Sequence, residues 1–221
     1  MNTHRRGRCI LLGSLVFSLM ALVPQRTVAQ TAKGVELYNS WDYQEAEKVL
    51  RAALKANPQD IRASFYLGLS ILLQEKYKEA LDIFQKVKDD QGKTEQRPGS
   101  PVPNEYQLQI GMARAHLGLK QYPEAWLNLE SAMKLDARSP DVYVYRGAYY
   151  IQQEKPQEAI KDLEKAIARD AQNVYAHYYA GQAYLRSGNP ARAVDMFKIF
   201  LKLAPQAPEA VKAKALIDAL C

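Results

Sequence analysis

The chain has 221 residues, a length that suits one or two domains. Its formal net charge is +6, but four of the 30 basic residues and none of the 24 acidic residues precede Gln30, so the chain from Gln30 onward has a net charge of only +2. This small excess, without a basic stripe interleaved with aromatic residues, argues against nucleic acid as a partner.

Residues 1–29 have the features of a secretory signal peptide. Three of the first eight residues are arginines, residues 10–23 form a nearly uninterrupted apolar run, and Thr27–Ala29 offers small residues at a cleavage site. The apolar run of 14 residues is short for a membrane span, which needs about 20. We therefore expect a periplasmic or secreted protein. The alternative is an uncleaved leader that anchors the chain to the inner membrane, the only membrane contact that we expect.

One spacing of residues recurs along most of the remaining chain. In residues 174–207 the motif is Gly181, Tyr184, then Ala193 and Phe197, and finally Pro205. The same positions are occupied by small and large apolar residues in four other segments, and the last three of the five segments follow one another without an insertion. These segments are residues 27–60, 61–94, 106–139, 140–173 and 174–207. The pattern resembles the tetratricopeptide repeat (TPR), whose signature is W-x2-L-G-x2-Y…A-x3-F…P over 34 residues.

The apolar periodicity agrees with this resemblance. In the second half of the first repeat, Ala46, Leu50 and Ala53 recur at helical spacing, and small residues such as Gly147 and Gly181 allow two helices to approach closely. One helical hairpin cannot bury its apolar face alone, so neighbouring repeats must stack. Residues with N-capping side chains are expected to begin the helices: Asp42, Asp60, Ser139, Asn173 and Asn189.

The resemblance implies an all-α TPR solenoid, a right-handed superhelix of helix-turn-helix repeats with a C-terminal capping helix. The predicted organisation is a signal peptide at 1–29, repeats 1 and 2 at 30–90, a Pro-rich loop at 91–105, repeats 3 to 5 at 106–207, and the capping helix at 208–221. The loop is either a tolerated insertion, since long surface loops cost little extra entropy, or a contact loop. Cys221, the one cysteine after the leader, is either a frayed terminus or a thiol that pairs between chains.

The sequence gives no indication of an enzyme. After the leader there are two histidines, His116 and His177, and both occupy packing positions of the repeat. The motifs of zinc proteases, P-loops, redox dithiols and serine hydrolases are absent. We therefore predict no catalytic residues, no cofactor and no metal.

The resemblance points instead to a binding surface, because in TPR proteins the first helix of each repeat lines a concave groove. Tyrosines gather on those helices, and they would offer rigid aromatic area with a hydrogen-bonding tip. We expect Tyr178 to face this groove, so that its replacement by alanine would weaken binding and leave the fold intact. The predicted groove residues are Arg62, Phe65, Tyr66, Leu69, Arg114, Tyr145, Tyr175, Tyr178, Tyr179, Gln182 and Arg186.

Two functions remain open from the sequence. The first is a non-enzymatic adaptor or scaffold of the bacterial cell envelope that holds an extended peptide or a helix of a protein partner in the groove. The alternative is a glycan-binding or assembly subunit of a polysaccharide export system, with tyrosines stacked on sugars. The Lys/Asn/Arg clamp of chaperone-binding TPR domains is absent, since the corresponding places hold residues such as Thr31, Val35, Tyr66 and Gln107. The sequence does not indicate an oligomeric state.

The leader generates a testable prediction. We expect export to remove residues 1–29, because the small residues Thr27–Ala29 precede Gln30 in the position of a cleavage site. N-terminal sequencing of the exported protein should therefore begin at Gln30. A chain that still begins at Met1 and sediments with membranes would show instead that the leader is an anchor.

Overall fold

The computed structural model of the chain describes residues 27–91 and 103–220, and every regular element in these ranges is a helix. None of these helices is both long enough and apolar enough to span a bilayer. Most of the predicted leader, the centre of the predicted loop at 91–105, and Cys221 lie outside the described residues. Residues 27–39 are helical in the described part of the chain, and Thr27 is buried.

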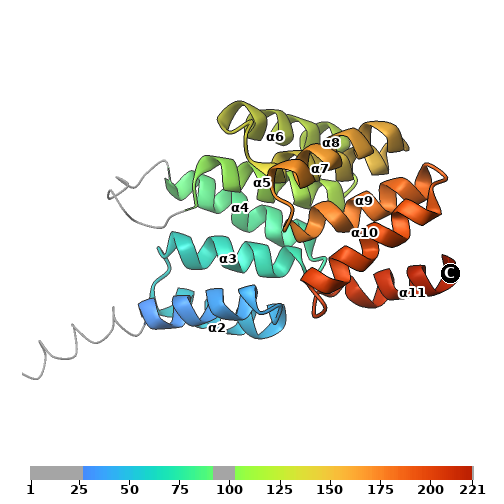
Figure 1. The fold of residues 1–221 in the computed structure, drawn as a ribbon. Coiled ribbons are helices and arrows are strands. Elements are labelled where there is room, and N and C mark those ends of the chain that lie inside the picture. The colour runs from blue at the N-terminus through green and yellow to red at the C-terminus, as the bar shows by residue number, and fades with distance from the viewer. Residues whose placement is uncertain (1–26, 92–102, 221) are drawn as a thin grey trace, which may run out of the picture.

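The helices alternate along the chain with short turns (Figure 1). After the helix at 27–39 they are α2 (Tyr43–Ala56), α3 (Ile61–Leu72), α4 (Tyr77–Gln91), α5 (Glu105–Gly118), α6 (Tyr122–Leu135), α7 (Pro140–Gln152), α8 (Pro156–Arg169), α9 (Val174–Arg186), α10 (Pro190–Leu203) and α11 (Ala210–Leu220).

Successive pairs of helices form five hairpins that stack side by side, and α11 follows the fifth. The predicted repeat starts at residues 61, 140 and 174 coincide with the first residues of α3, α7 and α9. The first helices of neighbouring repeats, α3, α5, α7 and α9, also contact one another and so form the inner layer of a curved array. The all-α repeat solenoid expected from the sequence is confirmed.

The turn inside each repeat has the same backbone conformation five times. Trp41, Glu75, Lys120 and Glu154 have φ values between +56° and +67°, and Gly188 has +79°. In every case the next residue donates its N–H to the carbonyl five residues back, as Asp42 N does to Leu37 O at 3.0 Å. This is the Schellman pattern, which ends a helix with a left-handed residue.

Four of the five predicted N-caps hold as predicted. Asp42, Asp60, Asn173 and Asn189 each accept a hydrogen bond from a backbone N–H of the following helix. Ser139 precedes α7 but makes no capping bond; its Oγ accepts instead from the Tyr106 hydroxyl at 2.8 Å, across to the neighbouring repeat. The capping prediction for Ser139 is therefore wrong, because a tertiary partner takes its hydroxyl.

In four of the five repeats, the two helices meet where a glycine faces a large side chain 16 residues later. A Cβ atom built on any of these glycines would lie 2.5–2.6 Å from that side chain, closer than real Cβ contacts allow. The backbone of the first helix therefore touches the side chains of the second directly. The pairs are Gly34–Leu50, Gly68–Phe84, Gly147–Leu163 and Gly181–Phe197.

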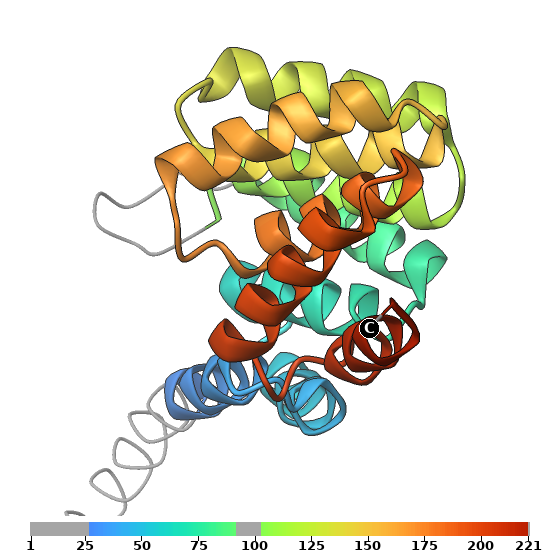
Figure 2. The same ribbon diagram turned by 45° about the vertical axis from the view of Figure 1, so that its right-hand side comes forward.

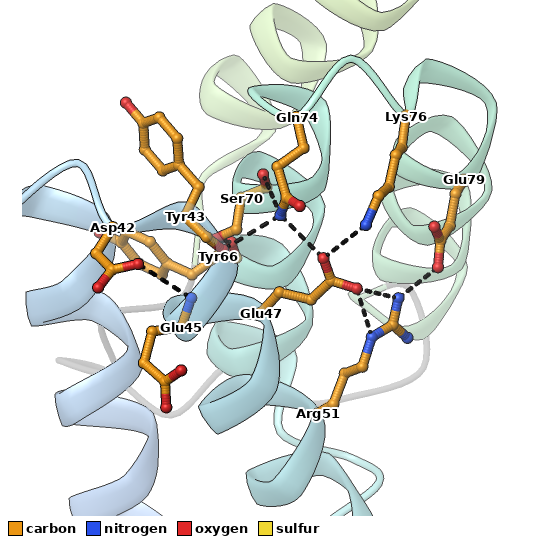
Figure 3. A network of polar contacts seen from close by, with 10 residues as sticks. All are labelled: Asp42, Tyr43, Glu45, Glu47, Arg51, Tyr66, Ser70, Gln74, Lys76 and Glu79. Atoms are coloured by element: carbon orange, nitrogen blue, oxygen red, sulfur yellow. Dashed lines mark hydrogen bonds and ion pairs between the residues drawn. The ribbon is translucent and has the colours of Figure 1, made fainter. Parts of the chain in front are cut away.

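A polar network joins the first and second repeats on the outer surface (Figure 3). Glu47 of α2 accepts from Lys76 Nζ, Gln74 Nε2 and Arg51, each at 2.9 Å, and Arg51 also reaches Glu79. Burial alone would raise the pKa of Glu47, but hydrogen bonds from Lys76, Arg51 and Gln74 lower it. The charges in this network satisfy one another, so it ties α2 to α4 and leaves Glu47 without a free acceptor for a ligand.

The two ends of the array meet through an aromatic contact. The ring of Trp41, in the turn of the first repeat, lies 6.3 Å from the ring of Tyr43 and 6.3 Å from that of Tyr175 on α9. Trp41 also packs against the apolar cluster of the last repeats. In both views the last helices curve back toward the first ones (Figures 1 and 2). We call this contact of Trp41, Tyr43 and Tyr175 the aromatic closure.

The close contacts of the glycines predict that a larger side chain at any of these glycine positions destabilises the array. Replacing Gly181 with leucine should lower the free energy of unfolding by about 1–3 kcal/mol or more, because the new side chain meets the Phe197 ring. Chemical denaturation measures this. Gly188→Leu is not a suitable control because φ is positive there, so Ala191→Leu, at an exposed place on α10, serves instead. Equal stability of Gly181→Leu and the parent would contradict the contact.

The aromatic closure predicts a coupling between the first and last repeats. Trp41→Ala should lower the free energy of unfolding by about 1–2 kcal/mol, since each aromatic pair contributes about 0.5–1.5 kcal/mol. Amide hydrogen exchange of residues 27–56 should accelerate in this variant, and Trp41→Phe should retain most of the protection. Unchanged exchange in the first repeat would mean that the contact does not hold the ends together.

Candidate functional site

The inner face of the array contains two adjoining pockets. The larger, of about 290 Å³, we call the Tyr106 pocket; its walls come from the first helices of the five repeats. It is lined by Tyr38, Phe65, Tyr66, Leu69, Tyr106, Gln107, Ile110, Gly111, Arg114, Asp141, Tyr145 and Tyr175. The smaller, of about 150 Å³, we call the Tyr77 pocket. It is lined by Leu72, Leu73, Glu75, Tyr77, Arg114, Leu117, Gly118, Tyr145, Ala148, Gln152, Tyr175, Tyr179 and Glu209.

Three residues belong to both pockets and separate them. Arg114 comes from α5, Tyr145 from α7 and Tyr175 from α9, so each repeat in the second half of the array contributes one. The guanidinium carbon of Arg114 lies 4.9 Å from the centroid of the Tyr145 ring, a cation–π distance. Together the two pockets are the groove of this protein, and Arg114 lies at its centre.

Seven of the eleven predicted groove residues line these pockets. They come from four different repeats, so the array does bring them together as the family resemblance implied. Their role in binding remains a prediction. The seven are Phe65, Tyr66, Leu69, Arg114, Tyr145, Tyr175 and Tyr179.

Three further predicted residues lie outside the pocket linings. The guanidinium of Arg62 lies 6.0 Å from the centroid of the Tyr66 ring, beside the Tyr106 pocket. Arg186 donates from Nη1 to the carbonyl oxygen of Ile151 at 2.8 Å, which joins the ends of α9 and α7. Gln182 is partly buried on α9. Arg186 thus has a structural hydrogen bond that a partner would have to replace.

The expectation that Tyr178 faces the groove is wrong. Its side chain is 5% exposed, and its ring lies 5.1 Å from the ring of Phe200 and 6.2 Å from that of Phe197, both on α10. Tyr175 and Tyr179 lie one turn apart on the groove side of α9, whereas Tyr178 lies on the side that packs on α10. Replacing Tyr178 with alanine would therefore leave a cavity in the core and destabilise the fold.

Three tyrosines and one glutamate are among the groove residues that were not predicted from the sequence. Tyr38 belongs to the first repeat, Tyr77 begins α4 and Tyr106 lies in the first turn of α5. Glu209 precedes α11 and reaches the Tyr77 pocket from the C-terminal segment. The sequence does contain a signal for the three tyrosines, because aromatic residues close to the groove-lining helices are candidates for the groove. Nothing local to Glu209 indicates that the array curls enough to bring it there.

Burial raises the pKa of several groove tyrosines further above neutral pH. It raises the pKa of Tyr179 to about 12 and that of Tyr106 to about 12, with Arg114 opposing the shift at Tyr179 and a hydrogen bond to Ser139 opposing it at Tyr106. Burial also raises the pKa of Tyr145 well above its usual value, against the charge of Arg114. Neutral phenols do not neutralise the guanidinium that they surround.

Glu209 lines the Tyr77 pocket, and its carboxylate interacts electrostatically with the guanidinium of Arg114. Burial raises its pKa, and the charge of Arg114 opposes this. Its Oε2 atom and the hydroxyl of Tyr175 are both buried, and the interaction with Tyr175 lowers the pKa of Glu209 against the effect of burial. The Tyr77 pocket therefore contains two buried polar groups that already interact with each other.

A third pocket, of about 410 Å³, lies outside the groove between α6 and α7. Trp126 and Met133 form its apolar wall, and Arg146 and Tyr150 close it from α7. Arg146 is already paired with Asp162 at 3.1 Å. This pocket is the other place on the described surface where a partner could seat a side chain.

The described residues show no arrangement that suggests catalysis. They contain no group of three or more His, Cys, Asp or Glu side chains placed to hold a metal ion. His177 is buried, with Nε2 at 3.0 Å from the carbonyl oxygen of Ala171, and His116 Nδ1 lies 2.8 Å from Gln121 Oε1. Both histidines form these hydrogen bonds close by in the chain, and neither of them lines the groove.

Comparison with known proteins agrees with the fold. A family model described as tetratricopeptide repeat matches residues 31–101 and 146–208. No curated protein matches by sequence. Among solved structures, a thermophilic TPR protein of Thermus thermophilus is 18% identical with a TM-score of 0.70, over 88% of this chain and 98% of that one.

Two further structures show the same fold at low identity. The APC/C hetero-tetramer Cut9–Hcn1 is 16% identical with a TM-score of 0.67, over 94% of this chain and 39% of that one. MamA from Desulfovibrio magneticus RS-1 is 18% identical with a TM-score of 0.50, over 82% of this chain and 97% of that one. The family match covers more than half of the chain. The chain therefore belongs to the tetratricopeptide repeat family, whose members are in general protein-interaction scaffolds and not enzymes.

Proposed function

We propose that this protein is an adaptor of the bacterial cell envelope that holds a segment of a partner protein in the groove. The observation that supports this most directly is the pair of adjoining pockets on the inner face, built by side chains from every repeat. The proposed location rests on the leader-like residues 1–29 of the sequence.

The size and lining of the groove suit an extended segment. The two pockets measure about 150 Å³ and 290 Å³ and adjoin at Arg114, so they fit individual side chains of a chain that runs across the inner helices. Phe65 and Leu69 line the Tyr106 pocket but are themselves buried, so the partly buried rings of Tyr66 and Tyr106 would provide most of the surface for an apolar side chain. Rings of this kind give the largest binding contributions at interfaces.

The glycan alternative receives less support from the same geometry. Sugars stack on flat aromatic faces, but the groove rings mostly meet one another edge to face. Tyr38 and Tyr66 cross at 72°, and Tyr145 and Tyr179 cross at 71°. In each such pair one ring presents its face to the edge of the other, so less aromatic face remains for stacking on a sugar.

The proposal is tested by crosslinking from the groove. Gln107 lines the Tyr106 pocket and is exposed, so a photoreactive amino acid there should capture the partner in intact envelopes. The same amino acid at Lys161, exposed on α8 outside the groove, is the control. Mass spectrometry of the product identifies the partner and the segment that was captured.

The affinity of that segment is then measured for a groove variant. Tyr66→Ala should weaken binding about thirtyfold, since a hot-spot tyrosine contributes about 2 kcal/mol and each 1.4 kcal/mol is a factor of about ten. Lys161→Ala should bind normally. Equal crosslinking from both positions, or an affinity lost only in the double variant Glu130→Ala/Lys134→Ala of the third pocket, would overturn the groove assignment.

A further inference from the structure

The centre of the groove holds a positive charge that both pockets share. Arg114 is the one lysine or arginine among the residues that line the Tyr106 pocket and among those that line the Tyr77 pocket. Its side chain is partly buried, and its guanidinium lies against the Tyr145 ring. Arginine stays protonated in proteins, so this charge is permanent.

Among the described residues, Arg114 has no carboxylate partner, in contrast to two other arginines of the array. Arg146 pairs with Asp162 at 3.1 Å, and Arg51 pairs with Glu47 at 2.9 Å. In the part of the chain that the structure describes, Arg114 forms no ion pair within 4.0 Å; its close neighbours are neutral tyrosines. This guanidinium has lost part of its hydration without gaining an anion in return. Hydrogen bonds between a guanidinium and a carboxylate are stronger than those between neutral groups, so a carboxylate that enters the groove can bind here.

The acidic groups near Arg114 do not fill this place. Asp141 lines the Tyr106 pocket but accepts from Asn173 Nδ2 at 3.1 Å, which holds it to α9. Glu75 and Glu209 both line the Tyr77 pocket. The Tyr106 pocket is therefore the less acidic of the two as well as the larger, and exposed Gln107 marks its opening. An anion that approaches Arg114 meets less repulsion from that side.

We propose that Arg114 receives a carboxylate of the partner segment, which enters through the Tyr106 pocket. The inference rests on the proposed groove function and adds the chemistry of the partner: an aspartate or glutamate side chain beside apolar residues. The guanidinium binds the carboxylate, the Tyr145 ring holds the guanidinium in place, and the partly buried rings of Tyr66 and Tyr106 contact the neighbouring apolar side chain.

The probe is a set of 12-residue peptides selected from a random library against the purified chain. The library fuses the peptide C-terminus to its carrier, so only side-chain carboxylates are available in the selection. Selected peptides are synthesised twice, with Asp or Glu and with Asn or Gln in the same place, and each with a free or an amidated C-terminus. Comparing the affinities within each pair shows whether binding needs a side-chain carboxylate or a terminal carboxylate.

The expected result is a loss of affinity of about tenfold or more on the amide exchange at one acidic position, since a bond to a charged group contributes about 1.5–3 kcal/mol. The free and the amidated forms of each selected peptide should bind alike. A loss of affinity on amidation instead of on the side-chain exchange would show that Arg114 receives a terminal carboxylate and would overturn the proposal. Arg114→Met should cause a similar loss, and Arg114→Lys a smaller one. Lys198→Met, which removes an exposed charge on α10, is the matched control and should change nothing.

The two proposals fail in different ways. If Tyr66→Ala weakens binding but neutral peptides bind as tightly as acidic ones, the groove stands and the carboxylate at Arg114 is wrong. If neither Tyr66→Ala nor the Arg114 variants affect binding, or no peptide is selected, both proposals fall. Thermal unfolding of each variant is measured in parallel. Should Arg114→Met not fold, the comparison of acidic and neutral peptides on the parent chain still decides.

Discussion

The contact between a glycine on the first helix of a repeat and a large side chain on the second sets the geometry of the whole array. Gly68 against Phe84 and Gly181 against Phe197 bring two backbones as close as an aromatic ring permits. That distance fixes how the two helices lie on each other, and the same hairpin repeated five times produces a curved stack. The inner face of the stack, with its pockets, follows from this repeated contact.

Local spacing was sufficient to predict the helices and the register of the repeats. Gly147 and Leu163 occupy matching places in the motif, and their contact is present in the structure. Ser139 shows where local logic stops: its position before α7 fits an N-cap, but the Tyr106 hydroxyl from the previous repeat takes its side chain. Partners from another repeat cannot be identified from the local sequence.

The groove was only partly predictable for a related reason. Tyr175, Tyr178 and Tyr179 lie within two turns of one helix and have the same side chain, but the tilt of α9 on α10 buries Tyr178 and directs the other two inward. Arg114 was predicted from its place in the repeat. Its isolation from carboxylates was not, because that depends on how small rotations between repeats add up over the array. The same accumulation brings Glu209 into the groove.

The aromatic closure has a consequence for how this protein can evolve. An open solenoid gains or loses whole repeats at little cost, because each unit contacts only its neighbours. Here Trp41 at one end touches Tyr175 near the other, so one unit more or fewer between them would separate the rings and open the groove. The number of repeats between Trp41 and Tyr175 is therefore constrained. We expect related chains to vary in length only in the segments that connect helices and at the ends beyond this contact.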